Sequence, residues 1–241
     1  MVIQVEALLE ETSFPVLGLG EGKTALFQRY FQELVEWNKV VNLTAIVDPD
    51  EVVTKHFLDS LSVARVIPND TLAGGSLADV GSGAGFPGLP LRIAWPDLRV
   101  TLVESVGKKA TFLRHVAETL GLAGVEIENG RAETLAHRER LRESFDVVAS
   151  RAVARMATLA ELTLPFCKPG GVVVTQKKAG VQDELKEAER AIAMLGGELE
   201  RVEVVDDVEP GVPRWLVALR KTAPSPPNYP RRPGIPAKRP L

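Results

Sequence analysis

Apolar positions in the first 70 residues recur at the spacing of one helix face. Between Lys23 and Val41 they stand largely three or four residues apart, at Leu26, Phe27, Tyr30, Phe31, Leu34, Val35 and Trp37. A second helix is predicted from Asp48-Pro49, an N-cap residue followed by proline in the first turn, to about Ile67. We therefore predict an N-terminal helical extension over residues 1–72.

The pattern changes after Leu77, where short apolar runs alternate with helical spacing. The clearest predicted helix is Lys108–Leu120, and another lies near Val181–Leu195. Five strands are predicted before the later helix and two after it, at Leu77–Val80, Arg99–Val103, Val125–Glu128, Phe145–Ala149, Gly171–Thr175, about 200–205 and about 213–220. Such alternation predicts an α/β fold with a doubly wound, mainly parallel sheet over residues 73–220.

Composition is that of a soluble globular protein, with 45% hydrophobic and 25% charged residues among 241. The opening MVIQVEALLEET has no basic stretch followed by an apolar run, so no secretory leader is expected. No apolar run approaches the roughly 18 residues that span a bilayer. Cys167 is the single cysteine, which excludes an intrachain disulfide and a cysteine-based metal cluster. A cytoplasmic protein without a membrane partner and without a bound metal is expected.

Charge is unevenly distributed along the chain. Residues 221–241 contain five basic residues and no acid, whereas the other 220 have 24 basic and 32 acidic residues, a net charge near −8. Seven of these last 21 residues are proline, which favours an extended chain. We interpret this segment as a Pro-rich basic tail that is either solvated or laid along a phosphate backbone.

The stretch LADVGSGAGFPGLPL, residues 77–91, joins the first predicted strand of the sheet to a glycine-rich loop. Ligands of open parallel sheets bind beyond the carboxyl ends of the strands, so this loop is a candidate binding site. Residues 83–88 match the dinucleotide fingerprint G-x-G-x-x-G. An NAD(P)-dependent oxidoreductase is therefore one hypothesis.

Acidic residues around the loop favour S-adenosylmethionine over a dinucleotide. Asp79 can orient the loop or meet the ammonium of the cofactor, and a carboxylate is a poor neighbour for pyrophosphate. Pro87 lacks an N–H that a diphosphate would use. Glu104, at the end of the second strand, can accept hydrogen bonds from both ribose hydroxyls, and Ala132-Glu133 can address the adenine edge. The alternatives are that Asp79 caps a turn and Glu133 is a first-turn helix acid.

Several stretches together resemble one known family. They are WNKVVNLTAI (37–46), HFLDSL (56–61), DVGSGAGFPGLPL (79–91), VESVGKKATFL (103–113), FDVVASRAVA (145–154), KPGG (168–171) and YPRRPGIPAKRPL (229–241). In this order they closely resemble the glucose-inhibited division B family, the RsmG-type methyltransferases of small-subunit ribosomal RNA. The family often has threonine where this chain has Ala149.

The resemblance implies a class I S-adenosylmethionine-dependent methyltransferase fold, Rossmann-like, with a seven-stranded mixed sheet ending in an antiparallel hairpin. It implies transfer of a methyl group from S-adenosylmethionine to N7 of a guanine in 16S rRNA, with S-adenosylhomocysteine as product. The implied partner is 16S rRNA or a small-subunit precursor, and we expect a monomer. Carried over by motif position, the cofactor contacts besides Asp79 are Gly81, Ser82, Gly83, Phe86, Glu104, Ser105, Val106, Ala132, Glu133 and Arg151.

Guanine N7 carries a lone pair and no proton, so its methylation requires no general base. We therefore assign no catalytic base. Arg151 follows the fourth strand and can bind the methionine carboxylate, a phosphate or guanine O6, or form a structural ion pair. His56 and Asp59, three apart on one helix face, are expected to form a local pair or capping network rather than to act in catalysis.

Contacts with RNA are predicted at two places in the chain. The candidate residues are Lys108 and Lys109 at a helix start, and Arg231, Arg232, Lys238 and Arg239 in the tail. A noncatalytic RNA-binding or ribosome-assembly module is the remaining alternative, because the tail alone accounts for binding without methyl transfer.

Overall fold

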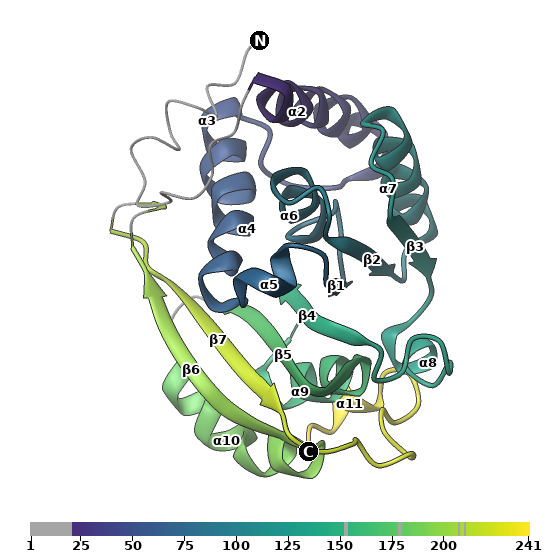
Figure 1. Ribbon diagram of the computed structural model, residues 1–241, viewed down its shortest axis with the longest axis vertical. Coiled ribbons are helices and arrows are strands. Elements are labelled where there is room, and N and C mark those ends of the chain that lie inside the picture. Colours follow the sequence, from purple (N-terminus) through teal and green to yellow (C-terminus); the bar gives the residue numbers. More distant parts are fainter. Residues whose placement is uncertain (1–20, 152–153, 178–179, 207, 210) are drawn as a thin grey trace.

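A seven-stranded mixed sheet runs through the centre of the computed structural model, which describes residues 21–241 except 152–153, 178–179, 207 and 210 (Figure 1). The strand order is β3-β2-β1-β4-β5-β7-β6. Strands β1 to β5 are parallel, and β7 pairs antiparallel with both β5 and β6. The strands are β1 (Ser76–Val80), β2 (Arg99–Glu104), β3 (Val125–Asn129), β4 (Phe145–Arg151), β5 (Cys167–Lys177), β6 (Gly197–Val205) and β7 (Arg214–Lys221). The predicted mixed sheet with its antiparallel hairpin is confirmed.

Helices cover both faces of the sheet and enclose two apolar cores (Figure 1). Successive strand residues point to opposite faces, so Leu77 belongs to one core and Ala78 to the other. The first core packs under α2 (Glu21–Val41), α6 (Gly88–Ala94) and α7 (Gly107–Thr119). On the opposite face lie α8 (Ala132–Leu135), α9 (Met156–Thr163), a 3₁₀ turn (Leu164–Phe166) and α10 (Val181–Met194).

The second predicted helix has the expected extent but not a uniform winding. Asp48 caps it, because its Oδ1 accepts hydrogen bonds from the backbone N–H groups of Asp50 and Glu51, both at 3.1 Å. Four segments then follow without a break: α3 (Pro49–Val52), a π-helical turn η1 (Val53–Leu58), α4 (Asp59–Ser62) and a 3₁₀ turn η2 (Val63–Val66). The short α5 (Asn69–Leu72) leads to the sheet. Apolar spacing does not distinguish a π turn from an α turn, so η1 could not be predicted from the pattern.

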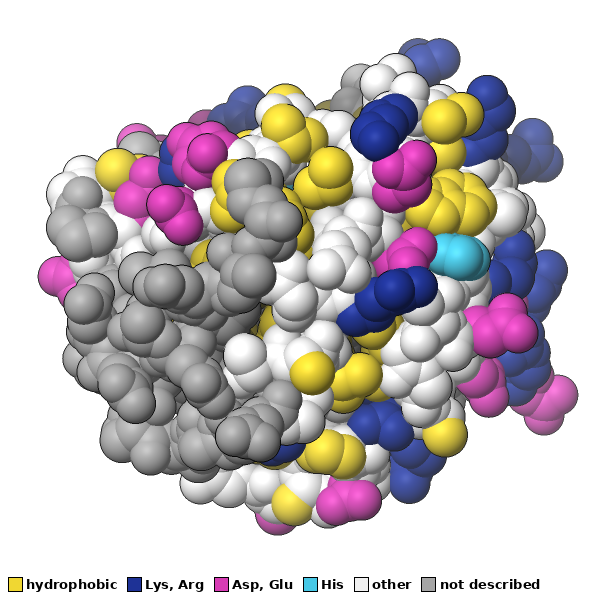
Figure 2. Space-filling model, turned by 90° about the horizontal axis from the view of Figure 1, so that it is seen from above, with side chains coloured by type: hydrophobic (Ala, Val, Ile, Leu, Met, Phe, Trp, Pro, Cys, Tyr) yellow, Lys and Arg dark blue, Asp and Glu magenta, His cyan; other side chains and the backbone are white. Residues whose placement is uncertain are grey.

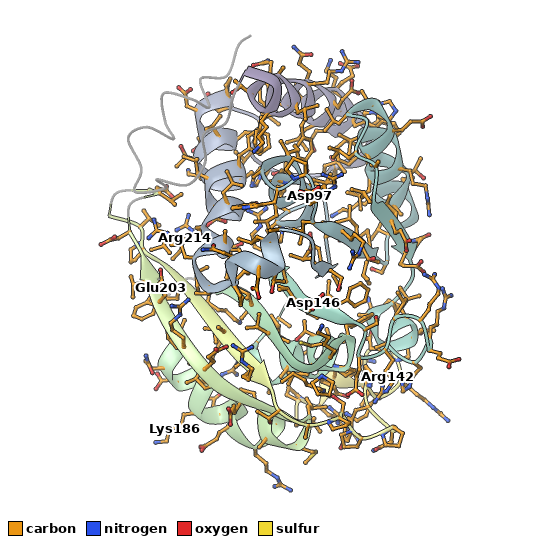
Figure 3. The ribbon with its side chains drawn as sticks, in the orientation of Figure 1. Asp97, Arg142, Asp146, Lys186, Glu203 and Arg214 are labelled. Atoms are coloured by element: carbon orange, nitrogen blue, oxygen red, sulfur yellow. The ribbon has the colours of Figure 1, made fainter. Side chains whose placement is uncertain are left out.

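The C-terminal segment packs on the protein instead of extending into solvent. Lys221 is the last residue of β7, is fully buried, and donates to the carbonyls of Leu164 and Leu195 at 3.0 Å. Arg142 donates to the carbonyls of Ser225 and Tyr229 (both 2.9 Å) and thereby holds the segment at the end of the molecule shown in Figure 3. Its last helix, α11 (Ile235–Lys238), lies beside α9 (Figure 1). A wholly solvated tail is therefore wrong for residues 221–241, and its basic count includes the buried Lys221.

Among the described residues, no helix is both long and apolar enough to span a bilayer. The first 20 residues, where the absence of a secretory leader was predicted, lie outside the described residues.

Candidate cofactor and substrate site

The glycine loop follows β1 at the edge of the sheet where the parallel strands end. Gly85 has φ +101°, and a Cβ there would lie 2.7 Å from the Tyr30 hydroxyl and 2.5 Å from Leu89 Cδ1. A Cβ on Gly88 would meet Asp79 Oδ2 at 2.9 Å. These two positions require glycine for conformation and space, so the loop turns tightly against the protein.

Glu104 ties two loops together at the end of β2. One carboxylate oxygen, Oε2, accepts the backbone N–H of Gly83 at 2.9 Å, and the other, Oε1, accepts that of Val106 at 2.7 Å. Its side chain is buried (6% exposed). Each carboxylate oxygen has two lone pairs, so both oxygens retain one for a further donor. The predicted binding role for Glu104 thus has an added structural part that the sequence did not show.

Asp79 lies beneath the loop and is fully buried. Its Oδ2 accepts the backbone N–H of Gly88 at 2.9 Å, whereas its Oδ1 is buried without a hydrogen-bond partner among the described residues. Burial raises the pKa of Asp79 from 3.8 to about 7, although the Gly88 N–H and the charge of Arg151 oppose that rise. Asp79 therefore orients the loop and keeps one acceptor unused.

Ser82 serves the loop internally. Its hydroxyl donates to the Asp79 carbonyl at 2.8 Å and its side chain is buried. Its backbone N–H donates to the Val103 carbonyl (3.2 Å) and its carbonyl accepts from Gly85 (2.7 Å), so Ser82 shapes the loop and its contact with a cofactor stays a prediction.

A cavity of about 90 Å³ opens beside the loop, between the ends of β1 and β2 and the start of α8. It is smaller than the roughly 300 Å³ at which pockets for whole small-molecule ligands begin, so it accommodates one end of a ligand. Four predicted cofactor residues line it: Gly81, Ser105, Ala132 and Glu133. Val106, predicted beside them, is an exposed apolar side chain on the neighbouring loop.

The same cavity has walls that sequence reasoning missed. They are Val80, Val103, Gly130, Arg131 and Leu162. Val80 ends β1 and Val103 directly precedes the last residue of β2, so both were within reach of the strand prediction. Leu162 belongs to α9, whose eight residues are all buried, so no polar face in its sequence indicates which side meets the cavity.

Phe86 stands apart from that cavity, in an aromatic stack. Its ring lies 4.5 Å from His56 and 5.5 Å from Tyr30, centroid to centroid. The Tyr30 hydroxyl in turn donates to the carbonyl of Ala84 in the glycine loop. The stack joins α2, η1 and the loop, so Phe86 has a core role as well as its predicted place near the cofactor.

Arg151, at the end of β4, lies against this stack. Its guanidinium carbon is 4.9 Å from the centroid of the Phe86 ring, and its Nη1 donates to the Lys55 carbonyl and to Asp59 Oδ2, each at 3.1 Å. Its Nη2 lies 3.3 Å from His56 Nδ1. The predicted alternative of a structural ion pair is therefore present, while 17% of the Arg151 side chain remains exposed.

His56 and Asp59 do not pair with each other; both turn to Arg151. His56 Nε2 lies 2.8 Å from the Thr44 hydroxyl, and burial together with Arg151 lowers the pKa of His56 to about 4. Asp59 Oδ1 also lies 3.4 Å from Nε of Arg214, which reaches α4 from β7 (Figure 3). The predicted local His56–Asp59 pair is thus replaced by a network centred on an arginine from the sheet.

The residues predicted to contact RNA differ in whether their side chains form ion pairs within the protein. Lys108 is exposed, Lys109 is half-buried, and neither forms an ion pair with any residue that the structure describes. In the tail, Arg232, Lys238 and Arg239 are exposed. Arg231 instead forms a two-oxygen ion pair with Glu161, with Nε–Oε1 at 2.9 Å and Nη2–Oε2 at 2.6 Å. Figure 2 shows Lys and Arg side chains gathered along one edge, on the side where Figure 1 has α7 and β3.

Solved structures of other proteins indicate which fold class this chain has. Solved structures of similar fold include TYW2 from M. jannaschii in complex with AdoMet (TM-score 0.52, 15% identity, covering 69% of this chain and 76% of that one). TrmN from Thermus thermophilus is another (TM-score 0.53, 19% identity, 70% and 53%). The antiparallel β7 between β5 and β6 also differs from the 3-2-1-4-5-6 order of classic dinucleotide-binding sheets. The chain therefore has the fold of class I S-adenosylmethionine-dependent methyltransferases.

Sequence relatives identify the family within that class. A family model described as rRNA small subunit methyltransferase G (GidB) matches residues 23–211. Ribosomal RNA small subunit methyltransferase G of Geobacillus thermodenitrificans is 47% identical over 99% of this chain and 98% of its own length. The protein of that name from Roseiflexus castenholzii is 50% identical over 93% and 94%. The chain belongs to the rRNA small subunit methyltransferase G family.

Proposed function

We propose that this enzyme transfers a methyl group from S-adenosylmethionine to N7 of a guanine in 16S rRNA of the small ribosomal subunit. Membership of the rRNA small subunit methyltransferase G family carries the proposal. The partner is 16S rRNA or a precursor of the small subunit, met in the cytoplasm by a monomeric enzyme. The strand order differs from that of classic dinucleotide-binding sheets, which argues against the oxidoreductase hypothesis. Membership of a methyltransferase family argues against a noncatalytic RNA-binding module.

The residues beneath and beside the glycine loop fit S-adenosylmethionine. The unpartnered Oδ1 of Asp79 suits an ammonium group, and the remaining lone pairs of Glu104 suit two ribose hydroxyls. Ala132 and Glu133 border the cavity that would hold the adenine, and the exposed Val106 on the neighbouring loop would supply an apolar contact. A diphosphate would meet the buried Asp79 instead, which supports a cofactor with a positive group at this point.

The chemistry asked of the protein is mainly positioning. When bound, the cofactor supplies an electrophilic methyl group on a sulfonium. Guanine N7 already presents a lone pair, so no side chain needs to remove a proton. The chain has to bind a splayed or flipped guanine in line with the methyl group and exclude water.

Arg151 is the residue we assign to the border between cofactor and guanine. It ends β4 at the same sheet edge as Glu104, and its planar fork suits a carboxylate, a phosphate or guanine O6. Asp59, Lys55 and the Phe86 ring hold that fork from behind. A restrained arginine loses less side-chain freedom on binding than a mobile one, which supports a recognition role.

RNA binding is assigned to exposed or half-buried cations that form no ion pair with any acid in the described part of the chain. Lys108 and Lys109 begin α7, directly after the Glu104–Val106 loop, and so lie next to the proposed cofactor site. Arg232, Lys238 and Arg239 provide a second group in the C-terminal segment. Backbone phosphates of the rRNA are the ligands that such side chains prefer.

The test uses the full chain with labelled S-adenosylmethionine and small-subunit RNA or particles from cells lacking this activity. We expect label in the RNA and chain cleavage at one 7-methylguanine after chemical treatment. Binding of S-adenosylhomocysteine is measured in parallel by calorimetry. Cofactor binding without label in any free or assembled form of the rRNA would contradict the proposed substrate.

A further inference from the structure

Two adjacent arginines in the C-terminal segment point in different directions. Arg232 is exposed, whereas Arg231 binds Glu161 of α9 through its guanidinium and through its backbone N–H, the latter at 2.8 Å. Glu161 is fully buried. A buried carboxylate needs a partner, so this pair fixes the C-terminal segment to α9 rather than leaving it free for RNA.

The same segment also reaches α8, on the other side of the proposed cofactor cavity. The backbone N–H of Gly234, whose φ is +81°, donates to Glu133 Oε1 at 2.9 Å. Arg131 donates to the same oxygen at 3.0 Å, and the Glu133 side chain is 3% exposed. The carboxylate of Glu133 is therefore directed to the C-terminal segment, while its residue still borders the cavity.

A third bond completes the connection. The Thr158 hydroxyl of α9 donates to the Pro236 carbonyl of α11 at 3.0 Å, and Thr158 is buried. Four residues further along α9, one helical turn away, Leu162 forms a wall of the cavity. Residues 231–236 thus bind both α8 and α9, the two short helices whose residues Glu133 and Leu162 border the cavity.

We propose that residues 231–236 brace the cofactor pocket, by holding α8 and α9 at the spacing that the cofactor requires. This inference rests on the proposed function, because it assigns the cavity to S-adenosylmethionine. Arg231 and Thr158 are positioning residues: they act through Glu161, α9 and Glu133 without touching the cofactor. The brace also divides the tail, since Arg231 serves the pocket and Arg232 remains for RNA.

The test compares variants by their affinity for S-adenosylhomocysteine, measured by calorimetry well below the melting temperature. A chain ending after Arg232 keeps the Arg231–Glu161 pair but loses Gly234 and Pro236. We expect the dissociation constant of this shortened chain for S-adenosylhomocysteine to rise by about tenfold, because it loses the hydrogen bond that orients the buried Glu133 carboxylate. Thr158→Val should raise it about threefold, and Thr158→Ser, which keeps the hydroxyl, should restore the original affinity.

Two controls separate the brace from other roles of the tail. Arg232→Gln should leave S-adenosylhomocysteine affinity within about twofold while weakening RNA binding. Ile192→Val removes a methyl group from the core at α10; it should lower the melting temperature without altering the affinity.

Equal S-adenosylhomocysteine affinity of the shortened and full-length chains would overturn the brace. If the shortened chain does not fold, the Thr158 pair decides, and equal affinities of Thr158→Val and the unmodified protein would overturn it. Failure of the unmodified chain to bind S-adenosylmethionine or S-adenosylhomocysteine would instead contradict the proposed function.

Discussion

The guanidinium carbon of Arg151 lies 4.9 Å from the centroid of the Phe86 ring, and its Nη1 lies 3.1 Å from Asp59 Oδ2. Three parts of the chain meet in this contact: the end of β4, the glycine loop and the N-terminal helical extension. A change in any one of them is therefore transmitted to the orientation of the arginine. This dependence makes Arg151 the first place to test the site.

Arg151→Lys should lower methyl transfer to RNA at least about tenfold while leaving the fold intact. Lysine keeps the charge but cannot bond to Asp59 and the Lys55 carbonyl with a planar fork, and a lost charge-assisted hydrogen bond is worth about 1.5–3 kcal/mol. Single-turnover transfer assays measure the effect. Arg155→Lys, at an exposed ion pair with Glu187, is the matched control. Equal rates for the two variants would refute the role of Arg151.

Glu104→Gln should weaken S-adenosylhomocysteine binding by about 10- to 100-fold. Glutamine turns one of the two acceptors toward Gly83 and Val106 into a donor, so one backbone N–H loses its partner, at about 1.5–3 kcal/mol for a bond to a charged group. Calorimetric titration gives the dissociation constants. Glu126→Gln, an exposed acid on the neighbouring β3, should bind as the unmodified protein does. If Glu104→Gln binds S-adenosylhomocysteine within twofold of the unmodified protein, the proposed role of Glu104 in the cofactor site is contradicted.

Asp79 should make the cofactor-free protein less stable as the pH rises. Its pKa is about 7 in the folded protein and near 3.8 when exposed, so between these values the folded state holds a proton that the unfolded chain has lost. Stability from this group falls across that window by up to about 4 kcal/mol. The difference in unfolding free energy between the unmodified protein and Asp79→Asn, measured by urea unfolding at pH 4.5–8, should fall as the pH rises, because groups common to both proteins, His56 among them, cancel in it. A difference that does not change with pH would contradict the raised pKa of Asp79.

The ionisation of Asp79 should also affect cofactor affinity, which should increase as the pH rises. An ammonium beside Asp79 favours the carboxylate, so affinity for S-adenosylmethionine should increase from pH 6 to pH 8 and change less in Asp79→Asn. Parallel pH profiles of the two proteins would show that Asp79 does not meet the cofactor.

His56 predicts a loss of stability at acidic pH. Burial and Arg151 lower its pKa from 6.5 to about 4, so the folded state holds fewer protons than the unfolded chain between these values. Its contribution is complete above pH 6.5 and is lost as the pH falls toward 4, by up to about 3 kcal/mol. The difference in unfolding free energy between the unmodified protein and His56→Gln should shrink over this range. A constant difference would contradict the lowered pKa.

Lys108→Gln with Lys109→Gln should weaken RNA binding and reduce its salt dependence. Two phosphate contacts on single-stranded RNA contribute about 1.4 to the slope of log affinity against log salt. Filter binding at 50–200 mM salt measures the slope. Lys186→Gln, an exposed lysine on α10 at the opposite end of the molecule (Figure 3), is the control. Slopes that stay equal would exclude α7 from the RNA surface.

The sequence predicted the sheet well because strand and helix periodicity are local properties. Glu104 and the glycine loop could be proposed as site residues for the same reason, since a strand end and a glycine run are visible within a few residues. The long-range partners of charged residues could not be predicted in this way. Glu161 is one acid in the apolar helix MATLAELT, and its cation Arg231 lies 70 residues away. No pattern along the chain separates Arg231 from Arg232, although one is paired and the other exposed.

The π-helical turn Val53–Leu58 gives the N-terminal extension a dependence on exact length. A π turn holds more residues than an α turn, so deleting one residue within it would restore regular winding and change which of its side chains face the sheet. His56 and Asp59 would then no longer face Arg151 together. Insertions and deletions should therefore be tolerated poorly in this stretch, even where substitution of an individual side chain has a modest effect.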